Sequence, residues 1–187
     1  MNNTKSDLSD LTRKEQNISA LDYDFISYDD FNKWHEKLVD NPANHLVKSR
    51  AINDNREIDI SSEEATILMV DDDDTCLYSM EIILMGSPYV LITLNSSREA
   101  LQYIKSNSEM IDLIFLDLHM PEMNGLELLE AIRNDPSLSM IPVILQSAAA
   151  DNKTLLSAYR LGIAGFLAKL YNKKQVLTAI RKVLDLF

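Results

Sequence analysis

The sequence predicts a doubly wound α/β domain from residue 65 onward, with helices covering both faces of a parallel sheet. Three observations support this fold class. Short apolar runs alternate with longer amphipathic segments, the apolar runs are continuous, and acidic or polar residues stand where several of these runs end. Continuous apolar runs are typical of strands that are covered on both faces, as they are in a parallel sheet.

Five strands and five helices are expected in strict alternation, which favours parallel strand order. The strands are predicted at residues 65–70, 87–94, 110–117, 140–147 and 164–170. The helices are predicted at residues 74–85, 96–107, 125–136, 151–162 and 173–187. Ser96 and Glu99 have the spacing of a capping box. Gly162 is expected as a C-terminal cap, because glycine readily adopts the left-handed conformation that ends many helices.

Residues 1–64 lack the alternating apolar runs and amphipathic segments of residues 65–187 and are expected to form a separate N-terminal extension. Residues 1–22 are polar without apolar periodicity, which predicts disorder. Residues 29–40 carry apolar side chains at helical spacing, Phe31, Trp34 and Leu38 among them, which predicts an amphipathic helix. That helix is expected to pack on its own domain or to meet a partner or second copy. Residues 53–64 are predicted to be a linker.

Composition excludes several function classes. The net charge of the 187-residue chain is −11, which argues against a nucleic-acid surface, because such surfaces need clustered Lys and Arg. Cys76 is the only cysteine, so no intramolecular disulfide can form, and a reducing compartment is expected. No apolar run approaches the roughly 18 residues of a membrane span, and the polar start does not resemble a signal peptide. We therefore expect a cytoplasmic protein.

The stretch ATILMVDDDD, residues 65–74, ends an apolar run in four consecutive aspartates. Ligands of open parallel sheets bind at the carboxyl ends of the strands. Reading only those ends collects Asp71, Asp72, Asp117, Ser147 and Lys169. Clustered carboxylates repel one another unless a cation offsets their charge, and hard oxygen ligands are those that Mg²⁺ prefers. The set suits phosphoryl transfer to a carboxylate, with Asp117 attacking in line while Lys169 and Ser147 stabilise charge.

Four stretches together resemble the receiver domain of two-component response regulators. They are VDDD (70–73), LDLHMPEMNGLELL (116–129), RNDPSLSMIPVILQSA (133–148) and GFLAK (165–169). The resemblance covers residues 65–187 and implies a CheY-like, flavodoxin-like sheet of five parallel strands in the order 2-1-3-4-5. It also implies a phosphorylation-dependent signalling switch rather than an enzyme, apart from self-phosphorylation and autodephosphorylation.

The resemblance also implies a role for each matching position. Asp117 resembles the phosphoacceptor, Asp72 a direct ligand of Mg²⁺ (or Mn²⁺), and Asp71 the second member of the acid pair. The backbone carbonyl of His119 resembles a further metal ligand. The remaining matches are Lys169, the hydroxyl position Ser147 and the switch aromatic Phe166. The implied partners are a sensor histidine kinase or phosphotransfer protein, followed by a downstream protein or a second copy. Asp73 and Asp74 are expected to begin the first helix instead, where negative charge meets the positive end of the helix dipole.

Two positions depart from the family pattern. Leu170 stands where a proline, often preceded by a cis bond, usually follows the lysine. A cis bond before a residue other than proline costs about 2.5–4 kcal/mol, so we expect a trans bond and a differently shaped loop. Ile163 stands where an alanine is typical. Neither departure changes the charged set.

Two other function classes stay open at this point. The first is a receiver-like interaction module that works without phosphorylation. The second is an aspartate-nucleophile phosphohydrolase of the haloacid dehalogenase-like kind, whose DxDxT pattern is only superficially permitted by Asp73, Asp74 and Thr75. Acyl-phosphate formation and turnover of a phosphomonoester distinguish the three.

Overall fold

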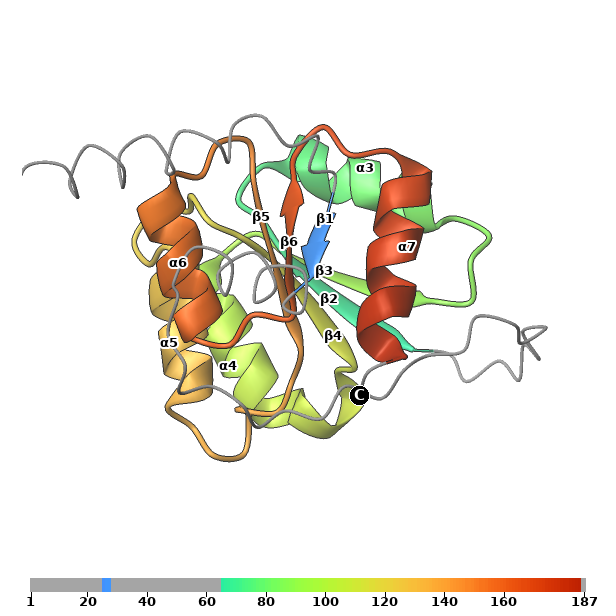
Figure 1. The fold of residues 1–187 in the computed structure, drawn as a ribbon. Helices are drawn as coiled ribbons and strands as arrows, with labels where there is room; N and C mark the ends of the chain where they lie inside the picture. The colour runs from blue at the N-terminus through green and yellow to red at the C-terminus, as the bar shows by residue number, and fades with distance from the viewer. Residues whose placement is uncertain (1–24, 28–64, 186–187) are drawn as a thin grey trace, which may run out of the picture.

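The computed structural model describes residues 25–27 and 65–185 of the chain. These residues form one sheet between two layers of helices (Figure 1). The strands are β1 (Phe25–Ser27), β2 (Thr66–Val70), β3 (Val90–Leu94), β4 (Leu113–Asp117), β5 (Val143–Ser147) and β6 (Gly165–Ala168). The helices are α3 (Asp74–Leu84), α4 (Ser97–Asn107), the short 3₁₀ turn η2 (Ser108–Met110), α5 (Gly125–Arg133), α6 (Asn152–Arg160) and α7 (Lys173–Leu184).

The order of the strands confirms the predicted fold class. Five parallel strands lie in the order β3-β2-β4-β5-β6, which is 2-1-3-4-5 when they are numbered along the chain. The pairing register sets Asp117 opposite Gln146 and Ser147 opposite Ala168. Residues that end neighbouring strands are thereby brought to one edge of the sheet.

Two apolar cores fill the space between the sheet and its two layers of helices. Alternate residues of β4 point to opposite faces, so Leu116 packs in the core under α4, α5 and α6, whereas Phe115 packs in the core under α3 and α7. Figure 1 shows these two groups of helices on either side of the sheet. Every residue of β4 and β5 is buried, which explains why their sequences read as continuous apolar runs up to the polar residues at their ends.

A sixth strand, β1, is the one feature of the described sheet that the sequence did not predict. It pairs antiparallel with β6, with Phe25 opposite Leu167 and Ser27 opposite Gly165. Three residues are too few to show a period of two, so no pattern in FIS indicated a strand. The effect is that β6, the edge of the parallel sheet, is itself covered (Figure 1).

Capping residues explain where the helices begin and end. Asp73 and Asp74 stand at the start of α3 as predicted, and Asp73 caps the helix, its side chain accepting from the Thr75 amide at 2.8 Å. Ser96 caps α4, and its hydroxyl accepts from the Glu99 amide at 3.4 Å. Gly162 follows α6 with a φ of 80°, the left-handed conformation expected of a glycine that ends a helix.

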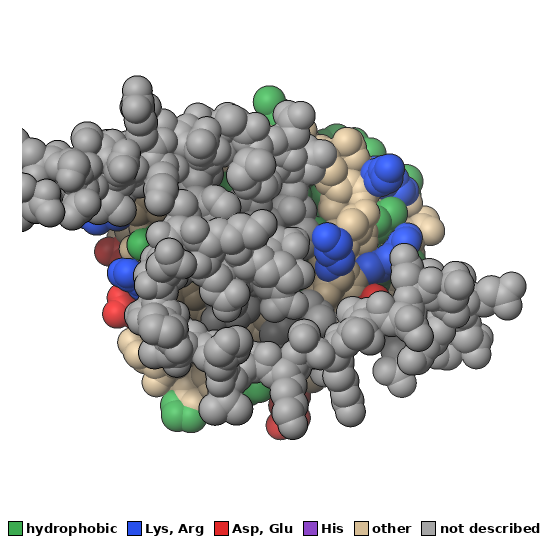
Figure 2. Space-filling view, viewed as in Figure 1, with side chains coloured by type: hydrophobic (Ala, Val, Ile, Leu, Met, Phe, Trp, Pro, Cys, Tyr) green, Lys and Arg blue, Asp and Glu red, His purple; other side chains and the backbone are tan. Residues whose placement is uncertain are grey.

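The predictions for the N-terminal extension cannot be compared with the structure. The predicted disordered start, the amphipathic helix at 29–40 and the linker at 53–64 lie outside the described residues. None of the helices within 65–185 has the length and apolar character to span a membrane. Figure 2, seen from the same side as Figure 1, shows Lys and Arg side chains where α7 lies. The basic residues in the last turn of that helix are Arg181 and Lys182.

Candidate functional site

The candidate site lies at the carboxyl ends of the parallel strands, where four strand ends deliver its side chains. Asp71 and Asp72 follow β2, and Asp117 is the last residue of β4. Ser147 is the last residue of β5, and Lys169 follows β6. The parallel arrangement therefore brings together residues that are nearly a hundred positions apart in the chain.

Lys169 joins two of the aspartates. Its Nζ lies 2.9 Å from Asp71 Oδ2 and 2.5 Å from Asp117 Oδ1. Asp71 and Asp117 are buried, and the side chain of Lys169 is 16% exposed. An ammonium group held between two buried carboxylates offsets part of their repulsion, which explains how this charge can be buried.

The second oxygen of each buried carboxylate accepts a backbone amide. Asp71 Oδ1 accepts from the Asp73 amide at 3.1 Å, and Asp117 Oδ2 accepts from the His119 amide at 2.7 Å. Both amides belong to the loops that leave the strands. The loops thus fix the orientation of the carboxylates, and an ionised carboxylate still has acceptor positions left after two such contacts.

Burial and charge shift the pKa values of this pair of groups. Burial raises the pKa of Asp71 above its ordinary value, although the hydrogen bonds from Lys169 and Asp73 act in the opposite direction. Burial also opposes the charge of Lys169, but the carboxylates of Asp117 and Asp71 outweigh it and raise the pKa of the ammonium group. Lys169 therefore stays charged throughout the neutral range.

The donor set fits a hard divalent cation. Asp71, Asp72 and Asp117 each offer a carboxylate oxygen, and these oxygens lie within 4.8 Å of one another. Asp72 is exposed whereas the other two are buried, so an ion at this point would have protein oxygens on one side and solvent on the other. Mg²⁺ prefers such a site, since it binds through one or two carboxylates and keeps several waters.

Ser147 and His119 stand beside the carboxylates, but their side chains make other contacts. The Ser147 hydroxyl is buried and donates to the Ala149 carbonyl at 2.8 Å. The His119 ring is exposed, and its Nε2 lies 3.2 Å from the same carbonyl. His119 therefore contacts the site through its backbone amide, which donates to Asp117, while the Ser147 hydroxyl is turned toward the loop that follows β5.

Phe166 precedes Lys169 in the sequence by three positions, and Leu170 follows it directly. Phe166 is 7% exposed and packs in the core under α4, α5 and α6. Leu170 is fully exposed, and its φ is 73°. No described peptide bond is cis, which agrees with the trans bond expected from the missing proline. Leucine rarely adopts a positive φ, so the loop after the lysine has an unusual shape.

Gly125 lies against the site, although no sequence pattern singled it out. It is the first residue of α5, and a Cβ added there would lie 2.2 Å from the backbone oxygen of Asp117. Its amide also donates to the Leu118 carbonyl at 3.0 Å. Only glycine lets α5 approach the main chain of the central aspartate this closely. The glycine after a helix-capping asparagine was the signal that could have found it.

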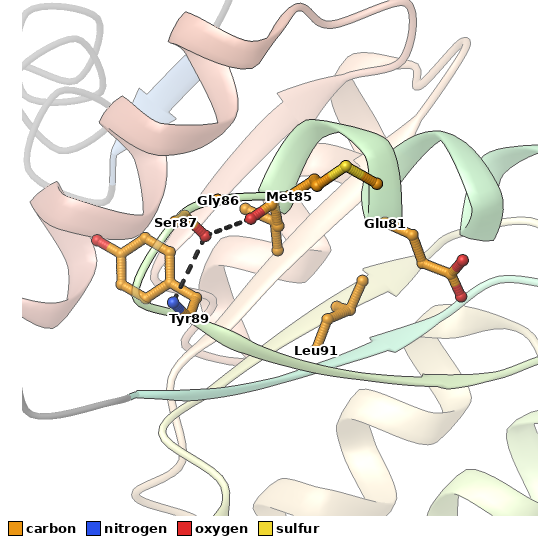
Figure 3. A pocket seen from close by; sticks show the side chains of 7 residues that line it. Glu81, Met85, Gly86, Ser87, Tyr89 and Leu91 are labelled. Atoms are coloured by element: carbon orange, nitrogen blue, oxygen red, sulfur yellow. Dashed lines mark hydrogen bonds between the residues drawn. The ribbon is translucent and has the colours of Figure 1, made fainter.

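A surface pocket elsewhere in the molecule does not contribute to this site. Figure 3 shows a pocket lined by side chains of the last turn of α3, the loop that follows it and the start of β3, including Glu81, Met85 and Tyr89. It lies where β3 begins, at the amino ends of the strands and therefore away from the aspartates. With one carboxylate and a mainly apolar lining, it lacks a charged set.

Comparisons with known proteins agree with the fold. A family model described as the response regulator receiver domain matches residues 67–181. The two-component response regulator ORR23 of Oryza sativa subsp. indica is 37% identical over 103 residues, which is 55% of this chain and 14% of that protein. The regulator ARR10 of Arabidopsis thaliana is 35% identical over 103 residues, which is 55% of this chain and 18% of that protein. The match thus spans less than a fifth of either relative.

Solved structures of receiver domains resemble this chain as well. The Vibrio cholerae chemotaxis protein CheY4 superposes with a TM-score of 0.60 at 25% identity, over 64% of this chain and 98% of that one. A CheY-like receiver domain protein from Methanospirillum hungatei has a TM-score of 0.60 at 27% identity, over 65% of this chain and 94% of the other. The family model covers more than half of the chain, and the chain therefore belongs to the response regulator receiver domain family.

Proposed function

We propose that this chain is a phosphorylation-dependent signalling switch, in which Asp117 accepts a phosphoryl group in a Mg²⁺-dependent reaction. The observation that carries the proposal is the buried Asp117 carboxylate, held by Lys169 at 2.5 Å beside Asp71 and Asp72. Receiver domains in general bind Mg²⁺ at an acidic pocket and are not enzymes in the usual sense. The donor would be a sensor histidine kinase or a phosphotransfer protein.

The proposed step is an in-line displacement at phosphorus. A carboxyl oxygen of Asp117 forms the new P–O bond, and the bond from phosphorus to the donor's imidazole nitrogen breaks. The nitrogen keeps the bonding electron pair and takes a proton from solvent. Lys169 moves from the carboxylate to the phosphoryl oxygens, where its charge stabilises the transition state.

Asp72 and Asp117, with the His119 carbonyl, would hold the Mg²⁺ ion, and Asp71 would lie beside it. Bound Mg²⁺ would supply positive charge to the equatorial phosphoryl oxygens. After transfer, the Ser147 hydroxyl would leave the Ala149 carbonyl, to which it donates at 2.8 Å, and donate to a phosphoryl oxygen. We infer that this movement, with a rearrangement of Phe166, changes the surface that a downstream protein or second copy binds.

The direct test is the intact mass of the full chain before and after incubation with acetyl phosphate and Mg²⁺. We expect a gain of one phosphoryl group that mild alkali removes, because an acyl phosphate hydrolyses under those conditions. Asp117→Asn keeps the shape of the side chain but removes the nucleophile, so the gain should vanish. Undiminished, alkali-stable labelling of Asp117→Asn would contradict the proposal.

The same assay separates the two alternatives. An interaction module that works without phosphorylation gives no mass gain in the wild-type chain. A phosphohydrolase would instead turn over a generic phosphomonoester. No described contact favours the hydrolase, because Asp73 is engaged as the N-terminal cap of α3 and its carboxylate accepts from the Thr75 amide.

A further inference from the structure

Gln146 is a buried polar side chain for which the proposed function so far has no use. It is the fourth residue of β5 and is 0% exposed. Neither its Nε2 nor its Oε1 has a hydrogen-bond partner in the structure. A buried amide without partners lowers the stability of the fold, because its bonds to water in the unfolded chain are not replaced. Such a group calls for a specific explanation.

The direction of Gln146 follows from the register of the strands. Side chains alternate along a strand, so Gln146 points to the same face as Ile144, toward the core under α3 and α7. Gln146 is the registered partner of Asp117 on β4 and of Leu167 on β6. Asp117 points to this same face, because Phe115, two residues earlier, packs in that core. The amide and the candidate phosphoacceptor are therefore neighbours on adjacent strands.

The surroundings of Gln146 offer few polar partners. Ile144 and Leu167 are apolar and fully buried. Asp117 has acceptor capacity left beyond its contacts with Lys169 and the His119 amide, since an ionised carboxylate offers about four acceptor positions. Tyr171 packs against the same core, and its hydroxyl lies in the field of Asp71 and Asp117. The polar end of this face is thus the acid site itself.

We propose that Gln146 is a positioning residue for Asp117, with its Nε2–H donating to the Asp117 carboxylate through one bound water. The bridge has the two to four polar partners that a buried water needs, since both ends of the amide and the carboxylate can contribute. It restrains the carboxylate in the orientation from which its oxygen attacks. This inference rests on the proposed role of Asp117 as phosphoryl acceptor.

The proposal makes stability and function move in opposite directions. In Gln146→Met the side chain keeps its length but carries no amide. We expect the full-length variant without metal to melt about 3 °C or more above wild type, because one bridging water satisfies only part of the hydrogen-bonding capacity of the buried amide, and the variant removes this partly compensated polar burial. We expect its labelling by acetyl phosphate with Mg²⁺ to be about tenfold slower, because the nucleophile is less well oriented. Ile144→Met is the matched control, on the same strand and face, and should change neither quantity in this way.

A second readout does not depend on phosphorylation. The side-chain amide resonances of Gln146 can be assigned in a nitrogen-15 spectrum as the pair that Gln146→Met lacks. Mg²⁺ alone should shift this pair in the wild-type chain, because the ion redirects the Asp117 carboxylate to which the water is bound. The Mg²⁺ concentration at half effect, read from the backbone amide resonance of Asp117 that both variants keep, should be several-fold higher for Gln146→Met than for Ile144→Met.

The outcomes separate this inference from the function on which it rests. If wild type is labelled and Gln146→Met is labelled at the same rate, Gln146 has no positioning role, whatever its melting temperature. If wild type is not labelled, the proposed function fails, and the amide resonances alone decide the role of Gln146. Resonances that do not respond to Mg²⁺ in a chain that binds it overturn the inference.

Discussion

At the scale of single residues, the site depends on how closely other groups approach Asp117. Lys169 lies on one side of its carboxylate, the His119 amide on another, and α5 begins directly against its main chain. These contacts come from three separate segments of the chain. Small changes in any of them should therefore alter the orientation of the Asp117 carboxylate, which the first prediction tests.

The first concerns Gly125→Ala. The added Cβ would lie 2.2 Å from the Asp117 backbone oxygen, and backbone cannot move aside as a flexible side chain can. We expect a loss of about 3 kcal/mol in the free energy of unfolding, at the upper end of the usual cost of overpacking. Denaturant unfolding measures it, and labelling by acetyl phosphate should slow as well.

Gly86→Ala is the matched control for that change. A Cβ there meets nothing within 4 Å, and only the φ of 75° is unfavourable. Its cost should stay near the 1–2 kcal/mol of a left-handed alanine. A Gly125→Ala cost no larger than that of Gly86→Ala would contradict the expected size of the clash with Asp117.

The second residue-level prediction concerns the Cys76 thiol. Burial, followed by the charge of Asp71, raises the pKa of Cys76 to about 11. Only the thiolate reacts, so alkylation by iodoacetamide should be slow at pH 8 and accelerate about tenfold per pH unit until the pKa is reached. Mg²⁺ at the acid site should lower this pKa and speed the reaction below pH 11, which a pH series with and without EDTA measures.

Asp72→Ala is the control, because Mg²⁺ should no longer accelerate alkylation once a proposed metal ligand is removed. An inflection near the ordinary thiol pKa of about 8.5, or no effect of Mg²⁺ on the wild-type thiol, would contradict this account of the field around Cys76.

At the scale of elements, the pairing of β1 with β6 is the feature with the widest consequence. β6 ends one residue before Lys169, so whatever holds this strand also helps to hold the ammonium group. Ordering each backbone residue of β1 costs about 1–2 kcal/mol, while each new hydrogen bond contributes about 0.5–1.5 kcal/mol. A three-residue strand is therefore marginal on hydrogen bonding alone, and it also lies against α7.

We predict that removing β1 loosens β6 without unfolding the domain. A chain lacking residues 1–27 should exchange the backbone amides of Gly165–Ala168 at least several-fold faster than wild type, measured by hydrogen exchange and mass spectrometry. A chain lacking residues 1–24 keeps β1 and is the matched control, with wild-type exchange expected. Equal protection of β6 in the two shortened chains would mean that β1 does not stabilise this edge.

At the scale of the whole molecule, we expect the acid site to oppose folding in the absence of a cation. The chain carries a net charge of −11, and three carboxylates gather at one point with one lysine among them. A cation that binds only the folded state stabilises it by mass action, by about 2.7 kcal/mol at a concentration one hundred times the dissociation constant. Mg²⁺ should therefore raise the melting temperature of wild type by several degrees.

Asp72→Ala tests whether this stabilisation comes from the site. Without metal it should melt above wild type, because one like charge is gone, and it should gain little on adding Mg²⁺. Sodium chloride at matched ionic strength separates specific binding from screening. An equal Mg²⁺-induced shift in both proteins would assign the ion to another part of the molecule.

Much of this molecule was predictable from local pattern. Continuous apolar runs indicated the parallel strands, because a strand buried on both faces has no polar alternation. Residues at the ends of those runs were expected to meet, because parallel connections bring all carboxyl ends to one edge, and the structure does bring Asp71, Asp117 and Lys169 into contact there. The helix cap at Asp73 was equally local, since a cap satisfies amides only two or three residues away.

Only the tertiary structure decided the features that depend on segments distant in the chain. No local pattern marks FIS as a strand, because β1 exists only through the free edge that β6 offers it. The close approach of Gly125 to Asp117, the direction of the Ser147 hydroxyl and the unpartnered amide of Gln146 likewise depend on how packed elements meet. Sequence by itself determined the elements and the chemistry at their ends, because period and residue type are local properties. Packing decided the contacts that orient this chemistry, because they join residues whose separation along the chain carries no signal.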